Sequence, residues 1–208
     1  VEGIGVLQSA KTYYYVFRGA SLINVVCNIS RNRAYPDFKN DSKFNNLTEN
    51  TMEILFKANS FPNTLNTLMG IESNYLLRIG DANIPNNQLQ VATSVNNCTS
   101  ADLQLESGKW YHVAAVWSGK SWDIFIDGVY VTGVATQGET INLSSDNSGG
   151  FYLGASYGGG RPLNGYVAEC RVWTRALTEA EISNNMNYVN PESDGLLAYC
   201  LLYTSDAA

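Results

Sequence analysis

A pair of carboxylates can act as acid and base in the hydrolysis of a glycosidic bond, and a Glu-x-Asp-x-x-Glu run on one strand is one way to provide the pair. Glu192 and Asp194 begin such a run here, but Leu197 occupies the position of the second Glu. Pro191 and Gly195 flank the acidic residues and indicate a turn. The segment is therefore predicted to be structural, and an acid pair in an unrecognised motif is the alternative.

Nucleophilic catalysis usually needs a histidine base. The chain has one histidine, His112, within the apolar run 111–117, which is typical of a core or sheet-face position. The triple-glycine run 158–160 precedes Arg161 and Pro162 instead of a helix, so it is not a phosphate cradle. The sequence predicts that the protein is not an enzyme.

Calcium is the metal that loop carboxylates and amides can bind, through side-chain and carbonyl oxygens. Asp81, Asp146 and Asn147 lie in predicted loops and carry such oxygens. Loop Asp and Asn residues more often form turns. No cofactor is therefore predicted, and calcium is kept as the alternative.

Sugar recognition is the chemistry that the residues around the triple-glycine run favour. Tyr157 offers an aromatic face to the C–H face of a sugar ring, while Arg161 and Asn164 offer donors and acceptors to its hydroxyls. The glycines let a ligand approach the backbone. Trp122 is a weaker surface candidate. These four residues are the predicted ligand-binding residues, and an ordinary exposed loop is the alternative.

Charge and composition limit the partners. The net charge is −6 and the pI about 4.7, and no Lys- or Arg-rich run is present, so nucleic acid is not expected as a partner. Only 15% of residues are charged, and Asn makes up roughly one residue in nine, well above ordinary usage. No apolar stretch is long enough to cross a bilayer. A glycan or cell-surface polysaccharide is the predicted partner.

Strands are the elements that must position these residues. Alternating or continuous apolar runs predict strands at residues 22–26, 52–58, 88–91, 111–117, 122–126, 129–131, 151–155 and 165–173. Asp127 and Gly128 supply the positive φ angles of a two-residue hairpin turn.

One helix is predicted, because Thr178 and Glu181 form a capping box and Leu177 can pack on Ile182. It should end near Met186. Without long helices between the strands, the sequence predicts an all-β fold: an antiparallel β-sandwich (jelly roll) with one short C-terminal helix.

Four segments carry a family resemblance. Residues 108–114 match the pattern Gly-x-Trp-x-His-Val-Ala, and residues 124–128 form an apolar strand end followed by Asp-Gly. Residues 165–178 resemble a closing strand and helix start, and residues 44–57 a first framework strand. Taken in chain order, the four segments resemble those of the laminin-G-like, concanavalin A-like lectin and glucanase jelly rolls, over about residues 13–199.

Two further features follow from that resemblance. Ala168 stands where the family often has Asp, an acid that can belong to a calcium site, so inherited calcium binding is not expected. Residues 13–28 resemble a junction in surface lipoproteins of glycan-harvesting gut bacteria. This implies that residues 1–12 are the tail of a preceding domain, that residues 13–199 are the jelly roll, and that the intact protein is exported and anchored at the outer cell surface by a lipidated N-terminus.

Residues 200–208 resemble, letter for letter, a translated sequencing adapter, and are expected to be a non-native tail. Without Cys200, three cysteines remain: Cys27, Cys98 and Cys170. Cys27 and Cys170 lie in apolar strand patterns typical of buried thiols. A bridge to Cys98 is the alternative, and the spacings match no zinc site.

The sequence thus predicts a non-catalytic carbohydrate-binding or adhesive module of an exported cell-surface protein. A glycosidase with an unrecognised acid pair and a structural or protein-interaction spacer are the alternatives. The missing acid run argues against the glycosidase. Nothing in the sequence separates the binding module from the spacer, because fold alone does not determine function.

Deleting residues 200–208 should leave the melting temperature within about 2 °C, since a tail without specific contacts contributes well under about 1 kcal/mol. Thermal unfolding of both chain lengths, followed by circular dichroism, measures the difference. A loss of several kcal/mol would show that the segment belongs to the folded domain.

Overall fold

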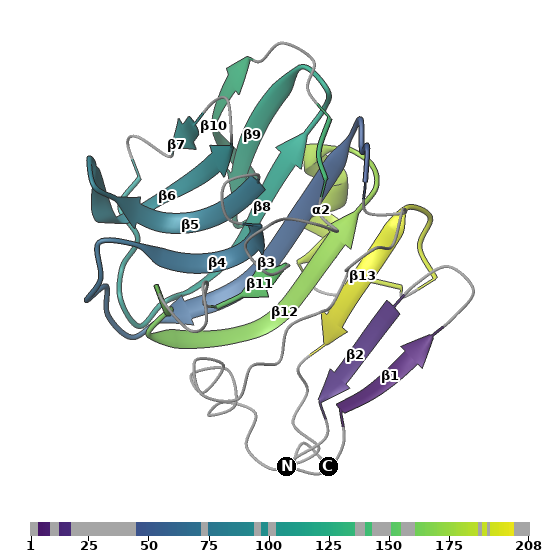
Figure 1. Ribbon diagram of the computed structural model, residues 1–208, viewed down its shortest axis with the longest axis horizontal. Helices are drawn as coiled ribbons and strands as arrows, with labels where there is room; N and C mark the ends of the chain where they lie inside the picture. The colour runs from purple at the N-terminus through teal and green to yellow at the C-terminus, as the bar shows by residue number, and fades with distance from the viewer. Residues whose placement is uncertain are drawn as a thin grey trace.

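The apolar runs of the sequence form two sheets that pack face to face, with one helix against the outside of the larger sheet in the computed structural model (Figure 1). The structure describes residues 4–8, 13–17, 45–71, 75–93, 97–99, 103–135, 140–142, 151–154, 161–186, 189–190 and 192–201. The predicted antiparallel β-sandwich with a short C-terminal helix is confirmed.

The larger sheet has eight strands. In spatial order they are β1 (Ile4–Gln8), β2 (Tyr13–Phe17), β13 (Leu196–Leu201), β12 (Gly165–Trp173), β3 (Asn50–Ala58), β8 (Trp110–Trp117), β9 (Ser121–Ile126) and β10 (Val129–Ala135). The smaller sheet has five, in the order β11 (Tyr152–Leu153), β4 (Asn66–Ile71), β5 (Tyr75–Asp81), β6 (Ile84–Thr93) and β7 (Asn97–Thr99).

Within the described residues, one strand pair departs from the antiparallel pattern. β13 runs parallel to β2, with Ala198 opposite Tyr13. β2 also pairs with β1 in an antiparallel hairpin, which joins residues on both sides of the boundary predicted at residue 12. The sequence could not predict the parallel pair, because the direction of a strand leaves no trace in its own residue pattern.

The core lies between the two sheets. Met52, Ile54 and Phe56 of β3 point into it and are fully buried, which confirms the alternation predicted for residues 52–58. Val91 enters from β6 on the opposite sheet. Each such side chain contributes roughly 1.5–3 kcal/mol through removal of apolar surface from water.

The continuous apolar run of β8 is explained by a second cluster on the outer face of the large sheet. Ala114 and Val116 of β8 pack there with Trp173 of β12, and with Ile182 of helix α2 (Glu179–Asn185). β8 therefore has buried residues on both faces along most of its length.

The predicted turn between β9 and β10 is confirmed, because Asp127 and Gly128 both have positive φ, at 51° and 78°. A Cβ on Gly128 would come within 3.1 Å of Ser183 in α2. Tyr130 next to the turn donates its backbone N–H to Glu179, at 3.4 Å. The hairpin tip is thus held against the helix.

The helix begins with the predicted capping box. Glu181 donates its backbone N–H to the Thr178 hydroxyl, at 3.3 Å, and Thr178 donates its own N–H to the Glu181 carboxylate, at 2.8 Å. Arg175 binds the same carboxylate at 2.7 Å. The backbone hydrogen bond from Thr178, helped by Arg175, lowers the pKa of Glu181 below its ordinary value of 4.5.

Three sequence predictions need comment. Residues 22–26 lie outside the described residues. The strand predicted at 151–155 is described as Tyr152–Leu153.

Cys200 and Leu201, predicted to make few contacts, continue β13, where they pair through their backbones with β12 and β2. A deletion that begins at residue 202 leaves these backbone pairs intact. No helix in the described part of the chain is long and apolar enough to span a membrane.

Glu181→Gln should lower the free energy of unfolding at neutral pH by about 0.5 kcal/mol, the usual size for an exposed ion pair. Because the folded state lowers the pKa of Glu181, this stabilisation is complete above the ordinary pKa and is lost as the pH falls through the lowered value. Urea unfolding at several pH values measures it. The difference between wild type and variant should be constant at neutral pH and shrink in acid; a difference that grows in acid would contradict the assignment.

Candidate functional site

Strand pairing brings Arg161 and Asn164 to the end of β3. Gly165, the first residue of β12, pairs with Ala58, the last residue of β3. The Asn164 carbonyl accepts the N–H of Asn59 at 2.8 Å. The loop backbone is therefore fixed to the large sheet.

The other side of the loop is fixed to the small sheet. The Arg161 carbonyl accepts the N–H of Thr67 in β4 at 2.9 Å. Gly165 is required at the join, because a Cβ there would lie 2.1 Å from the Lys57 carbonyl oxygen. The segment 161–164 thus bridges both sheets on a rigid backbone.

Side-chain amides gather where this segment meets the loop after β3. Asn164 is exposed and donates its Nδ2 to the Ser60 hydroxyl at 2.6 Å. Asn63 donates to the Pro162 carbonyl at 3.1 Å, and Asn86 donates to the Phe61 carbonyl at 2.7 Å. We call Asn59, Ser60, Asn63, Asn86 and Asn164 the amide rim.

The sequence analysis missed most of this rim. Its one signal was the pair of Asn residues and the Ser in segment 59–63 directly after a strand, which is also typical of an ordinary loop. Only the pairing of β3 with β12 brings this run beside Asn164.

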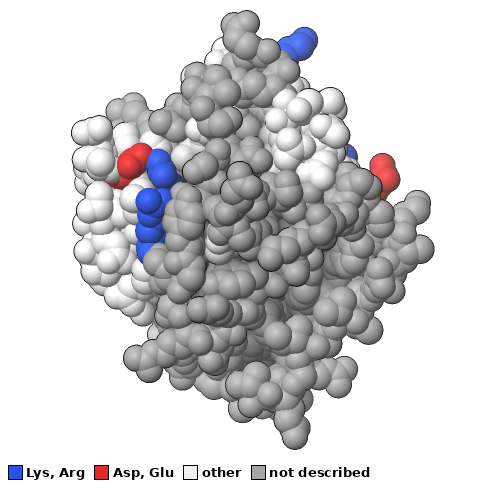
Figure 2. Space-filling view, viewed as in Figure 1, with Lys and Arg blue, Asp and Glu red and all other residues white. Residues whose placement is uncertain are grey.

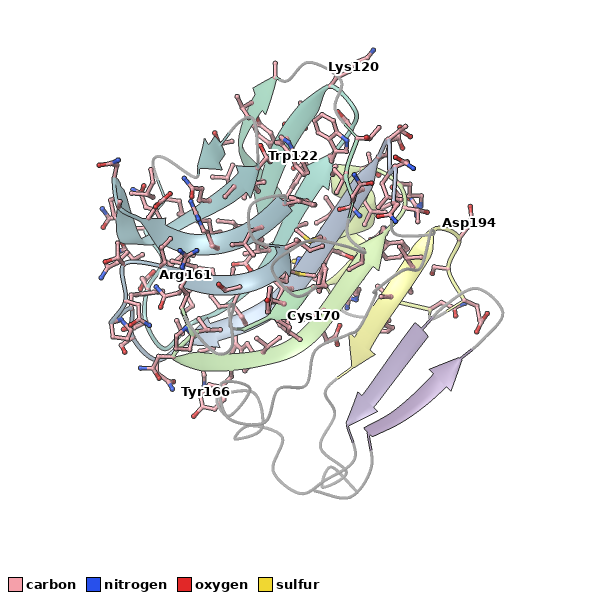
Figure 3. All side chains as sticks on the ribbon, in the orientation of Figure 1. Lys120, Trp122, Arg161, Tyr166, Cys170 and Asp194 are labelled. Atoms are coloured by element: carbon pink, nitrogen blue, oxygen red, sulfur yellow. The ribbon has the colours of Figure 1, made fainter. Side chains whose placement is uncertain are left out.

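Arg161 has a left-handed backbone, with φ at 51°, and a partly buried side chain (Figure 3). Such a conformation is uncommon for a residue with a Cβ and costs on the order of 1–3 kcal/mol. The contact of its carbonyl with β4 holds it in place. Strain of this kind is often kept at binding sites.

Tyr157 lies outside the described residues, between β11 and Arg161 in the chain. Its role as an aromatic platform remains a prediction.

Trp122 is not a surface residue, and that prediction is wrong. Its exposed fraction is 1%, and its ring lies between the two sheets (Figure 3). It stacks on Trp117 at a centroid distance of 4.8 Å and contacts Tyr75 of the small sheet at 4.2 Å. A position at the start of a hairpin strand resembles an exposed one in sequence, but the inward alternation of β9 directs this side chain into the core.

A Gly-x-Ser-x-Gly pattern, residues 154–158, was also passed over by the sequence analysis. A nucleophile elbow needs this pattern on a strand-to-helix turn of a parallel sheet. Here it follows β11, at the edge of an antiparallel sheet. The single histidine, His112, is buried on the outer face of the other sheet.

His112 belongs to a buried charged cluster beneath α2. Its Nε2 lies 3.3 Å from Glu53, which is itself buried. The Glu53 carboxylate accepts the indole N–H of Trp173 at 2.7 Å and the side-chain amide of Asn185 at 3.3 Å. The structural role predicted for His112 agrees with this position.

Arg171 supplies the positive charge of the cluster. Its guanidinium lies 3.7 Å from Glu53, contacts Glu169 directly, and donates to the Asn185 carbonyl at 3.0 Å. Burial by itself lowers the pKa of Arg171, but the two carboxylates together with Tyr199 outweigh it and hold the pKa above the ordinary value. The arginine stays charged and neutralises the buried acids.

The acidic run at 192–194 is a turn, as predicted. Ser193 donates its N–H to the Asn190 carbonyl at 2.9 Å, and Gly195 has φ at 76°. Leu197, in place of the second Glu, is buried. The turn lines a depression of about 390 Å³ without an opposing carboxylate among the lining residues.

Of the calcium candidates, Asp146 and Asn147 lie outside the described residues. Asp81 forms an ion pair with Arg78 and accepts the N–H of Ala82 at 2.6 Å. No group of three or more His, Cys, Asp or Glu side chains that could hold a metal ion occurs within the described ranges.

Charge is sparse on the side of the molecule shown in Figure 2, where most described atoms are uncharged. The described amide rim itself contains no ionisable side chain. The rim side chains thus offer hydrogen-bond donors and acceptors.

The two-layer antiparallel sandwich and its rim define a lectin-like β-sandwich, and the comparison with known families agrees. The chain belongs to the concanavalin A-like lectin/glucanases superfamily, whose laminin-G-type profile matches residues 31–183.

Solved structures extend the comparison. A candidate carbohydrate-binding protein from Bacteroides ovatus is 34% identical, with a TM-score of 0.69; the match covers 78% of this chain and 46% of that one. The chain thus spans about half the length of that relative. Domain 4 of the arabinanase AbnA from Geobacillus stearothermophilus, solved with arabinotriose, is 17% identical, with a TM-score of 0.52 over 67% of this chain and 66% of that one.

A heptameric pentraxin from Limulus polyphemus is 19% identical, with a TM-score of 0.51 over 73% of this chain and 76% of that one. At these identities the arabinanase domain and the pentraxin show the shared fold alone. No curated protein matches the chain.

Trp122→Ala should destabilise the protein by about 3–5 kcal/mol, because it leaves a large cavity between the sheets. The matched control is Trp110→Ala. The Trp110 side chain is 41% exposed, so its removal should lower the free energy of unfolding far less. Chemical unfolding measures both. A stable Trp122→Ala protein would contradict the core assignment.

Proposed function

We propose that this chain is a non-catalytic carbohydrate-binding module, and that the amide rim binds the sugar together with Arg161 and Tyr157. The observation that carries the proposal is the rim itself, a set of exposed and half-buried amides with one hydroxyl on a backbone fixed to both sheets. Family membership supports it, since the superfamily includes lectins. The 34% identity to a candidate carbohydrate-binding protein supports it further.

The chemistry of the rim suits a neutral sugar. An amide offers both a donor and an acceptor, and so does each sugar hydroxyl. Because Asn164 and Asn63 are already oriented by Ser60 and Pro162, little side-chain entropy is lost on binding. Tyr157 would add the aromatic face that the described rim lacks.

The carboxylates of the described residues support a role without catalysis. Glu53, which is buried, and Glu169, which is half-buried, are both held by Arg171. An acid pair for glycoside hydrolysis must flank a substrate and exchange protons with it, and carboxylates fixed by a buried arginine cannot do this. A glycosidase with an unrecognised acid pair remains the second candidate.

The cellular setting is proposed from sequence alone. We place the chain in an exported cell-surface lipoprotein, on the resemblance of residues 13–28. Residues 1–12 would end a preceding domain, residues 13–199 would form the binding module, and residues 200–208 would be the adapter-like tail. A spacer domain of the same fold is the competing possibility.

Tyr157→Ala should weaken glycan binding by about 1–3 kcal/mol, or roughly 5- to 150-fold in Kd, as loss of an interface aromatic usually does. A glycan array first identifies the bound sugar, and calorimetry then measures the variant. Asn164→Ala should weaken binding in the same direction. Both should leave the melting temperature nearly unchanged.

The matched controls are Tyr130→Ala at the Asp127–Gly128 hairpin and Asn184→Ala on α2, both exposed. Neither should affect binding. Failure of every array glycan to bind would favour the spacer. Release of reducing sugar that disappears with one Glu or Asp variant would instead show a glycosidase.

A further inference from the structure

A row of three side chains crosses the outer face of the large sheet. It lies toward the end of β3 that is away from Thr51 and from helix α2. Lys57 of β3 pairs with Tyr166 of β12 on one side and with Trp110 of β8 on the other. All three therefore lie at the same level of the sheet. We call Tyr166, Lys57 and Trp110 the aromatic–lysine row.

The two rings flank the ammonium group. Lys57 Nζ lies 4.8 Å from the centre of the Tyr166 ring and 5.3 Å from that of Trp110. At these distances the negative ring faces attract the cation. Tyr166 points away from the space between the sheets (Figure 3), and Trp110 is 41% exposed, one of few large apolar side chains so placed among the described residues.

The charge of Lys57 is not matched by an acid. Among the described residues, Arg78, Lys109, Arg171 and Arg175 each have a carboxylate partner, but no ion pair occurs at Lys57. Its neighbour two positions along the outer face of β3 is the half-buried Leu55, and the nearby acids, Glu169 opposite Leu55 and Glu53 further along β3, are both bound by Arg171. A protein of net charge −6 thus presents a positive charge between two aromatic rings.

We propose that the aromatic–lysine row is a second binding site, and that it takes an acidic saccharide, one that contains uronic acid. The carboxylate would bind the Lys57 ammonium in a charge-assisted hydrogen bond. The sugar ring would pack against the exposed part of Trp110 beside the ammonium group, with Tyr166 on the far side of the lysine.

Other occupants fit the row less well. A polyphosphate or nucleic acid needs several cations, and this protein is acidic. An apolar protein surface would have to bury the lysine charge without an acid partner, which is costly. One carboxylate on a carbohydrate ring satisfies both parts of the row.

This site uses different residues and a different ligand charge from the amide rim, so either site can fail without the other. The rim predicts binding of a neutral sugar that depends on Tyr157. The row predicts binding of an acid that depends on Lys57.

The test uses the full chain and calorimetric titration with trimers of galacturonic, glucuronic and mannuronic acid. Their methyl esters are matched neutral ligands. At least one acid trimer should bind, more tightly than its ester, and the binding should weaken as salt is raised.

Lys57→Met keeps the side-chain stem and removes the charge. It should weaken binding of the acid about tenfold or more, the loss expected for a charge-assisted hydrogen bond, while Lys57→Arg retains most of the affinity. Trp110→Ala should weaken both acid and ester. Lys120→Met, at an exposed lysine between β8 and β9, is the matched control and should change nothing, as should Tyr157→Ala.

Three outcomes would overturn the proposal: none of the acid trimers binds, ester and acid bind equally, or Lys57→Met binds as tightly as wild type. Circular dichroism of each variant confirms that it is folded. If a variant fails to fold, the wild-type chain gives the same decision: Trp110 is the exposed one of the four tryptophans, so a bound acid trimer should protect it from a soluble fluorescence quencher more than the matching ester does.

Discussion

The outer layer of this protein depends on one buried carboxylate. Glu53 lies in the middle of the large sheet, and a buried charge is stable only when its partners are in place. Arg171 provides the opposite charge from β12, and Asn185 provides an amide from α2. Removing one partner would leave an uncompensated charge, so the cluster holds the helix against β3 and β12. The apolar contacts around Ile182 supply the buried apolar area between α2 and the sheet, and the Glu53 carboxylate fixes the position of the helix.

This constraint divides the large sheet into two ends with different surroundings. Where α2 covers the sheet, both faces of β3 and β8 are buried and the polar groups are used for stability. Toward the other end no helix of the described chain covers the outer face, and the side chains there remain accessible: the amide rim after Ala58, and Lys57 between its two aromatic neighbours. A rigid sandwich that presents loops and strand ends is the usual way in which this kind of fold carries binding sites. Both proposed sites therefore lie on parts of the surface that do not help to hold the helix against the sheet.

Features that depend on neighbours in sequence could be predicted from the residues alone. The alternation in β3, the turn at Asp127 and Gly128, and the capping box at Thr178 each follow from a local rule, and the structure confirms them. The bounds of β12 were also predicted, because glycine and a polar turn mark its ends. Together these features were sufficient for the fold class, since strands without intervening helices leave few architectures.

Features that depend on register between distant strands required the tertiary structure. Trp122 was predicted to be exposed from its place at the start of a strand, yet it shares the inward face of β9 with Ile124 and packs on Tyr75 of the other sheet. Asn164 was predicted, but its partner Ser60 was not, since 104 residues separate them and only the pairing of β12 with β3 brings them together. The sequence by itself determined which segments are strands and where they turn, because those choices are made within a few residues. The tertiary structure decided which side chains share a surface, because the pairing of strands far apart in the chain sets which residues become neighbours.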